Sequence, residues 1–171
     1  MNMLEHALNY AERGWAVLPL HEIQEGRCAC GKPDCTSQGK HPKISGGLKS
    51  ATFNAETIRQ WWAQWPDANI GIVTGRVSGL MVVDIDHGAT KNGYASLQSL
   101  EAANGPLPRD LTVQTGGGGL HIYLSMPAVD IRNSTSKLAP HIDVRGEGGY
   151  VVAPPSRHIS GTRYTWENKN A

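Results

Sequence analysis

The chain has 171 residues, of which 39% are hydrophobic, and its formal net charge is +1. This length suits one domain with a sizeable buried core, and no apolar run is long enough to span a membrane. The near-neutral charge argues against a protein that holds nucleic acid by a strongly basic surface alone. The first residues lack the basic and apolar regions of a secretory signal, so we expect a cytoplasmic protein.

The first elements are predicted from hydrophobic spacing. Apolar residues recur at helical intervals over residues 3–13, and Gly14 stops the pattern, which predicts a helix. The apolar run at residues 15–20 then predicts a buried strand.

All three cysteines lie between positions 28 and 35 and are followed by a histidine. Because their number is odd and the chain is expected in the cytoplasm, a disulfide framework is unfavourable. Closely spaced thiolates and an imidazole instead favour a structural zinc ion with four protein ligands. We therefore predict a zinc-binding loop at about residues 26–43, with His21 as a reserve fourth ligand and reduced cysteines in a surface loop as the alternative. The predicted ligands are Cys28, Cys30, Cys35 and His41.

Asn54 is a candidate N-cap for a helix that runs to Pro66. This helix carries the pair Trp61 and Trp62, whose rings have two alternative roles. Exposed tryptophans can stack on nucleic-acid bases. Helical tryptophans more often pack in a core, and we expect that role here. A strand is predicted to follow at residues 69–74.

A further strand is predicted at residues 80–86, and it ends in an Asp-x-Asp pair formed by Asp84 and Asp86. Strand side chains alternate, so the two carboxylates share one face while Val83 and Ile85 share the other. Carboxylates beside apolar side chains require a cation, and we expect Mg²⁺ or Mn²⁺. The alternative is a strand end at which Asp86 begins a turn and Asp84 pairs with a nearby lysine or arginine.

Asn92 is expected to cap the next helix, which ends at Gly105. Residues 127–140, rich in serine, asparagine and proline, are interpreted as a loop, either an ordinary connector or a mobile segment that orders over a substrate. The strands predicted beyond the helix lie at residues 111–115, 120–125, 142–145, 149–153 and 163–167.

Four consecutive glycines at residues 116–119 separate two of these strands. Glycine lets a backbone approach a ligand closely, and exposed N–H groups in such a turn bind phosphate oxygens. We therefore expect Gly118 and Gly119 to bind a nucleotide. His121 follows on the next strand and can donate a hydrogen bond to a triphosphate. A flexible hairpin with a surface histidine is the alternative.

A later predicted strand places Asp143 and Arg145 on one face. If it neighbours the strand of Asp84, three carboxylates converge as in a two-metal nucleotidyl-transfer site, with ions roughly 3.5–4 Å apart. Arg145 would then bind phosphate oxygens. Further candidates for the nucleotide site are Ser156, Arg157 and His158.

Together these segments resemble the motifs of the archaeo-eukaryotic primase superfamily, and most closely those of its bifunctional primase/polymerase (prim-pol) branch. Asp84 and Asp86 match the Asp-x-Asp/Glu metal motif. His121 matches the histidine of the second motif, and Asp143 matches the aspartate of the third.

One position departs from the pattern of that branch. The second motif often reads Ser-x-His, whereas this chain has Gly119, so the Gly119 N–H or Thr115 would replace the serine hydroxyl. The resemblance nevertheless covers most of the chain. Its further segments lie at residues 39–42, 51–52, 61–62, 68–71, 74–75, 78–80 and 149–156.

The resemblance implies an α/β (α+β) fold with two lobes, an N-terminal α/β unit and an RRM-like or ferredoxin-like lobe, with the active site in the cleft between them. It also implies that residues 1–171 form a single prim-pol catalytic domain with the zinc-binding loop inserted in it. This domain would be an excerpt of a longer replication protein. The zinc-binding loop resembles one that helps to engage template or primer in some prim-pols.

The activity implied by the resemblance is that of a DNA primase/polymerase. Two Mg²⁺ or Mn²⁺ ions held by Asp84, Asp86 and Asp143 would support templated transfer from dNTPs or NTPs to a 3′-hydroxyl. The resemblance implies a role in plasmid or phage replication, including de novo primer synthesis. The implied partners are DNA template, primer and a helicase domain or separate helicase, and no membrane. Three other hypotheses remain open: a metal-dependent nuclease, a non-catalytic zinc-containing nucleic-acid-binding module, and a nucleotide-cyclase-like enzyme.

Overall fold

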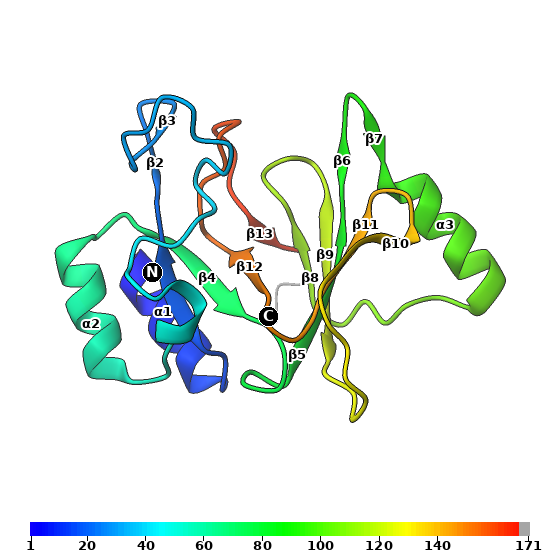
Figure 1. Ribbon diagram of the computed structural model, residues 1–171, viewed down its shortest axis with the longest axis horizontal. Helices are drawn as coiled ribbons and strands as arrows, with labels where there is room; N and C mark the ends of the chain where they lie inside the picture. Colours follow the sequence, from blue (N-terminus) through cyan, green and yellow to red (C-terminus); the bar gives the residue numbers. More distant parts are fainter. Residues whose placement is uncertain (168–171) are drawn as a thin grey trace.

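Helices and antiparallel sheets make up the structure, a computed structural model that describes residues 1–167 (Figure 1). This confirms the mixed α+β class expected from the sequence. The helices are α1 (Met3–Glu12), α2 (Ala55–Gln64) and α3 (Gly93–Asn104), with the 3₁₀ helix η1 (Gly47–Ser50). The strands are β1 (Val17–Leu20), β2 (Ile23–Gln24), β3 (Arg27–Cys28), β4 (Asn69–Val73), β5 (Leu80–Ile85), β6 (His87–Gly88), β7 (Lys91–Asn92), β8 (Thr112–Gln114), β9 (Leu120–Ser125), β10 (Ser134–Ala139), β11 (Ile142–Arg145), β12 (Tyr150–Ala153) and β13 (Thr165–Trp166).

Asparagine caps begin the three α-helices. The side chains of Asn54 and Asn92 accept a hydrogen bond from the third helical N–H, at 2.9 and 3.3 Å, which confirms both predicted caps. Asn2 forms a reciprocal capping box with Glu5 at the start of α1. None of the helices in residues 1–167 combines the length and the apolar composition that crossing a membrane requires.

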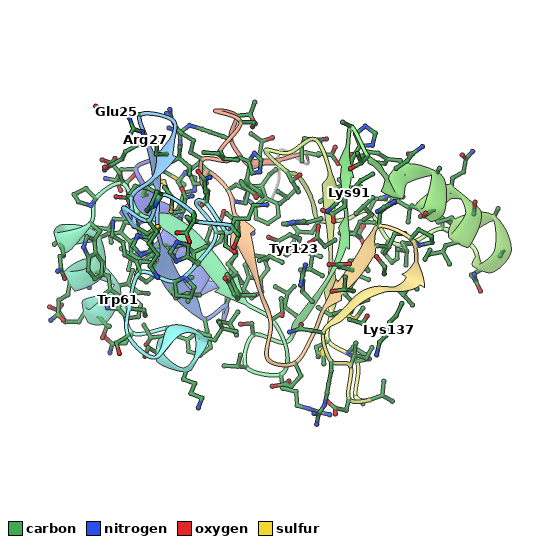
Figure 2. The ribbon with its side chains drawn as sticks, turned by 45° about the horizontal axis from the view of Figure 1, so that its top comes forward. Glu25, Arg27, Trp61, Lys91, Tyr123 and Lys137 are labelled. Carbon is green, nitrogen blue, oxygen red and sulfur yellow. The ribbon has the colours of Figure 1, made fainter. Side chains whose placement is uncertain are left out.

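The first sheet has the antiparallel strand order β1-β4-β12 and packs against α1 and α2. Ile58 and Trp62 of α2 join Ile70 of β4 in its core. Trp62 is 2% exposed and its Nε1 donates to the Ala68 carbonyl at 3.1 Å, so its expected core role is confirmed. Trp61 is partly buried and packs at the edge of this core, and Figure 2 shows it beside α2, far from the second sheet.

The second sheet has the antiparallel order β10-β11-β5-β9-β8-β13. α3 connects β5 to β8 and covers one face, where Leu97 packs against Val83 and Ile85. The alternation predicted for the Asp-x-Asp strand is therefore confirmed. The inner order β11-β5-β9-β8, with α3 crossing between β5 and β8, is the order expected of an RRM-like lobe.

The segment at residues 127–140 contains a strand that the sequence analysis missed. β10 pairs with β11 at the edge of the second sheet, so the loop interpretation is wrong for residues 134–139. Its side chains are mainly polar and exposed, and pairing at an edge uses the backbone, so the segment carries no apolar alternation to predict it. The strand is irregular, with φ of 52° at Ser136.

The two sheets share one continuous core, which decides where the polar site lies. Val82 of β5 and Tyr123 of β9 belong to the same buried cluster as the first sheet, and the Tyr123 ring lies 5.1 Å from the Trp166 ring between centroids. Asp84 and His121 lie two residues away from them on the same strands, and therefore on the same face. This face of the second sheet is thus apolar where it packs against the first sheet and polar beyond that contact.

Candidate active site

Asp84 is the centre of a polar cluster that spans three neighbouring strands. The register pairs Asp84 of β5 with Asp143 of β11 on one side and with His121 of β9 on the other. Directly paired residues in an antiparallel sheet face the same side, so the three side chains enter one space. His121 Nε2 lies 3.4 Å from Asp84 Oδ1. The strands of Asp84 and Asp143 are therefore neighbours, which is the condition that the sequence analysis set for the three carboxylates to converge.

Asp86 follows β5 directly and pairs with a lysine from the β6–β7 hairpin, which the sequence analysis missed. Lys91 Nζ lies 2.6 Å from Asp86 Oδ2, and Figure 2 shows Lys91 beside the central strands of the second sheet. The hydrogen bond to Asp86 raises the pKa of Lys91, and the charges of Asp143 and Asp84 act in the same direction. One ammonium group thus interacts with all three carboxylates.

Arg145 joins two of the carboxylates. Its guanidinium donates to Asp143 Oδ2 at 2.8 Å and lies 3.4 Å from Asp84 Oδ2. The other Asp143 oxygen accepts the Ser136 N–H of β10 at 3.0 Å, so the missed edge strand helps to orient this acid. The Arg145 side chain is 31% exposed and therefore also presents N–H groups to solvent. Its binding to phosphate stays a prediction.

Asp84 is held in its charged form. Burial by itself would raise the pKa of Asp84, but the neighbouring His121 and Arg145 outweigh burial and lower the pKa to about 2. A carboxylate that stays ionised at every physiological pH is suited to binding a cation.

The low pKa of Asp84 predicts a defined acid sensitivity. The unfolded aspartate titrates near 3.8 and the folded one near 2, so the folded state binds fewer protons between these values. The resulting contribution to stability, about 2 kcal/mol, is complete above about pH 4 and lost as the pH falls to about 2. Urea unfolding across this range should therefore show a smaller fall in the free energy of unfolding for Asp84→Asn than for the wild type. Equal falls in the two proteins would contradict the assignment.

The glycine turn before β9 is held closed by its own hydrogen bonds. The Gly118 N–H donates to the Thr115 carbonyl at 3.0 Å, and the Gly119 N–H donates to Thr115 Oγ1 at 2.9 Å. A side chain at Gly119 would collide with the Ile85 carbonyl, so glycine permits close approach to β5. Gly117 and Gly119 line the site, and in residues 1–167 no acceptor takes the Gly117 N–H. Phosphate binding by Gly118 and Gly119 stays a prediction.

The carboxylates and their basic partners line one pocket of about 520 Å³ together with Thr115, Gly117 and Gly119. This volume lies within the usual range of ligand pockets, roughly 300–1,000 Å³. One wall carries the three carboxylates, His121 and Arg145. The opposite wall includes Tyr150 of β12 and His158 from the segment that follows β12. It also includes Lys40 from the cysteine loop, which is the predicted zinc-binding loop at about residues 26–43. The pocket therefore opens between an acidic wall from the second sheet and a wall from the N-terminal lobe.

The three cysteines and His41 meet at one point of the loop after β1. One ligand atom from each of Cys28, Cys30, Cys35 and His41 lies within 4.8 Å of the others. His41 Nε2 is 3.4 Å from Cys28 Sγ and 3.5 Å from Cys35 Sγ. Tetrahedral zinc, with bonds of about 2.3 Å to sulfur and about 2.0 Å to nitrogen, places such atoms roughly 3.5 Å apart. The four residues therefore fit a structural zinc ion. His21 lies outside this set, with its ring 4.4 Å from that of His41 between centroids.

A family model described as bifunctional DNA primase/polymerase, N-terminal, matches residues 7–171, nearly the whole chain. The chain belongs to this prim-pol family. No curated protein is significantly similar to it. Prim-pol membership implies nucleotidyltransferase chemistry of the primase/polymerase type, with nucleic acid and nucleotides as substrates.

The prim-pol pocket contains only part of the segment after β12 that the sequence analysis considered. His158 lines it, whereas Ser156 is fully buried and accepts the Ile70 N–H at 2.9 Å. Arg157 lines a separate pocket. Lys40 is a lining residue that sequence reasoning did not assign, although it stands next to a predicted zinc ligand.

Proposed function

We propose that this prim-pol domain transfers nucleotides from dNTPs or NTPs to the 3′-hydroxyl of a nucleic-acid strand, in the order that a DNA template dictates. The observation that carries the proposal is the convergence of Asp84, Asp86 and Asp143 with His121 on one wall of a single pocket. A module that only binds nucleic acid needs no such cluster, because carboxylates repel phosphate unless cations neutralise them.

The cluster fits divalent metal ions. Three carboxylates converge there, with the basic side chains Arg145, Lys91 and His121 beside them. Carboxylate oxygens suit Mg²⁺ or Mn²⁺. We infer that Asp84, Asp86 and Asp143 hold two such ions. When bound, the ions would lower the pKa of the 3′-hydroxyl and offset the charge of the triphosphate.

The remaining side chains of the pocket would align the substrate. Arg145 and Lys91 orient the acids and present charged N–H donors that can also bind phosphate oxygens. His121 Nε2 faces the same space and can donate to a phosphate oxygen, as can the Gly117 N–H. Catalysis then depends on alignment and on neutralising the charge that develops as pyrophosphate leaves.

We also infer that residues 1–171 form one catalytic domain with the zinc-binding loop inserted in it. The shared core of the two sheets supports a single unit. Residues 168–171 of this range lie outside the described part of the chain. The domain would serve DNA replication in the cytoplasm, on template and primer, with a helicase on the same chain or on a separate one.

Paired assays of primer synthesis and primer extension test the proposed function. They use dNTPs and NTPs, with Mg²⁺ and then Mn²⁺, and measure strand cleavage on the same labelled DNA. We expect template-dependent addition without cleavage, and no addition when divalent ions are chelated. Cleavage without addition would indicate a nuclease, and DNA binding with neither reaction would indicate a binding module. Either result would overturn the proposal.

A further inference from the structure

The cysteine loop contributes directly to the acidic pocket. Ser37 and Lys40 of this loop line the pocket, and Lys40 immediately precedes the predicted zinc ligand His41. The pocket has three lysine or arginine side chains in its wall. Lys91 and Arg145 already pair with carboxylates, whereas no carboxylate in residues 1–167 lies within ion-pair distance of Lys40. Lys40 is thus an exposed cation at the pocket with its charge still available.

The backbone of Lys40 is attached to the first sheet by hydrogen bonds. The Tyr150 hydroxyl donates to the Lys40 carbonyl at 2.8 Å. The amide of Asn69, which is 1% exposed, donates to the Gly39 carbonyl at 2.8 Å and to the Arg157 carbonyl at 2.9 Å. A buried hydrogen bond therefore joins the loop to β4, and a hydrogen bond at the surface joins it to β12. Asn69 also links the loop to the segment after β12.

The same stretch of backbone is attached to the cysteine cluster on its other side. The Gly39 N–H points at Cys28 Sγ, at 3.5 Å, while the Gly39 carbonyl accepts from Asn69. Gly39 has φ of 72°, and a side chain there would approach Ile23 to 2.9 Å, so this position requires glycine. Lys40 consequently lies between Gly39, which contacts a cysteine thiol, and His41, which belongs to the cluster.

The space in front of Lys40 suits a phosphate group. His158 lines the pocket nearby; burial lowers the pKa of His158, and the charge of Lys40 lowers it further. Neutral His158 and charged Lys40 would both offer N–H donors. Arg145 and Lys91 lie with the acids on the other wall of the pocket. A polyanion can therefore bind between these two cations and Lys40.

We propose that Lys40 binds a substrate phosphate in this pocket and that zinc bound by Cys28, Cys30, Cys35 and His41 fixes its position. Zinc occupancy then sets the affinity for substrate as well as the fold of the loop. This inference rests on the proposed function. The phosphate belongs either to the triphosphate of the incoming nucleotide or to the backbone of primer or template.

The first test compares Lys40→Gln with Lys49→Gln, an exposed lysine of η1 outside the pocket. Both variants lose one positive charge. Zinc-loaded proteins are titrated with a fluorescent dNTP without DNA, and with a primer–template without nucleotide, each with Mn²⁺. We expect Lys40→Gln to weaken binding about tenfold in one of the two titrations, which identifies the source of the phosphate, and Lys49→Gln to change neither.

The second test separates positioning from direct contact. Tyr150→Phe removes the hydrogen bond to the Lys40 carbonyl and keeps the ring, so we expect about a threefold loss of affinity with the zinc content unchanged. If Tyr150 acts by holding Lys40, this loss disappears in the Lys40→Gln background. An undiminished loss in that background would overturn the positioning role of the hydrogen bond.

Zinc content is measured for every variant by mass spectrometry of the metal. Removal of zinc from the wild type by a chelator should weaken binding in the same titration as Lys40→Gln, and in Lys40→Gln it should have little further effect. The phosphate role of Lys40 would be overturned if Lys40→Gln kept wild-type affinity in both titrations, or if that variant lost its zinc. In either case, nucleotide incorporation by the wild type would still uphold the proposed function. A wild type that incorporates no nucleotide would overturn the proposed function itself.

Discussion

Changing Asp84 and Asp86 together to asparagine is expected to lower nucleotide incorporation by about 1,000-fold or more. Each asparagine keeps the shape of the side chain and can accept a hydrogen bond from Arg145 or Lys91, so the fold should persist. The two negative charges that would hold divalent ions are lost. Primer-extension rates with Mg²⁺ measure the effect, and electron paramagnetic resonance of Mn²⁺ measures ion binding independently.

Asp130→Asn is the matched control for this double variant. Asp130 is an exposed acid paired with Arg132 at 3.1 Å and does not line the pocket. We expect it to retain wild-type incorporation and Mn²⁺ binding. Extension by the double variant at the wild-type rate would remove Asp84 and Asp86 from the catalytic assignment, and a double variant that binds Mn²⁺ normally would remove them from the metal site.

Removal of the zinc ligand Cys28, by replacement with serine, is expected to lower the melting temperature by about 10 °C or more. Zinc binding to a loop that is unordered without it adds directly to the free energy of folding. The loop has little apolar core of its own, because Cys28 is the only buried hydrophobic residue in the region 24–40. Calorimetry measures the shift, and metal analysis should show the loss of stoichiometric zinc.

Asp34→Asn provides the control within the same loop. Asp34 is exposed and lies between two cysteines but is not one of the four clustered residues. It should keep its zinc and its melting temperature. A chelator should destabilise the wild type and Asp34→Asn but leave Cys28→Ser unchanged. Stoichiometric, tightly held zinc in Cys28→Ser would contradict the ligand assignment.

The sequence was a good guide where one residue pattern determines one local structure. Asn54 and Asn92 begin their helices as predicted, because an asparagine side chain accepts a hydrogen bond from its own helix. The alternation around Asp84 correctly separated the polar face of β5 from the apolar face that packs on α3. These interactions join residues close in sequence or follow from the two-residue period of a strand.

The sequence was a poor guide where pairing depends on the backbone or on a distant partner. β10 carries polar, exposed side chains, yet its Ser136 N–H orients Asp143. Lys91 approaches Asp86 only because a short hairpin returns the chain. Neither contact leaves a hydrophobic pattern in the residues that make it.

The sequence by itself determined the chemical groups of this prim-pol domain: the acids on one face of a strand, a histidine after a glycine turn, and three cysteines close to His41. Only the tertiary structure decided their neighbours. The strand order places Asp84 between Asp143 and His121, and hydrogen bonds from Tyr150 and Asn69 bring the cysteine loop to the pocket. The physical reason is that strand order and loop docking depend on how all the apolar faces are buried together, which no single segment specifies.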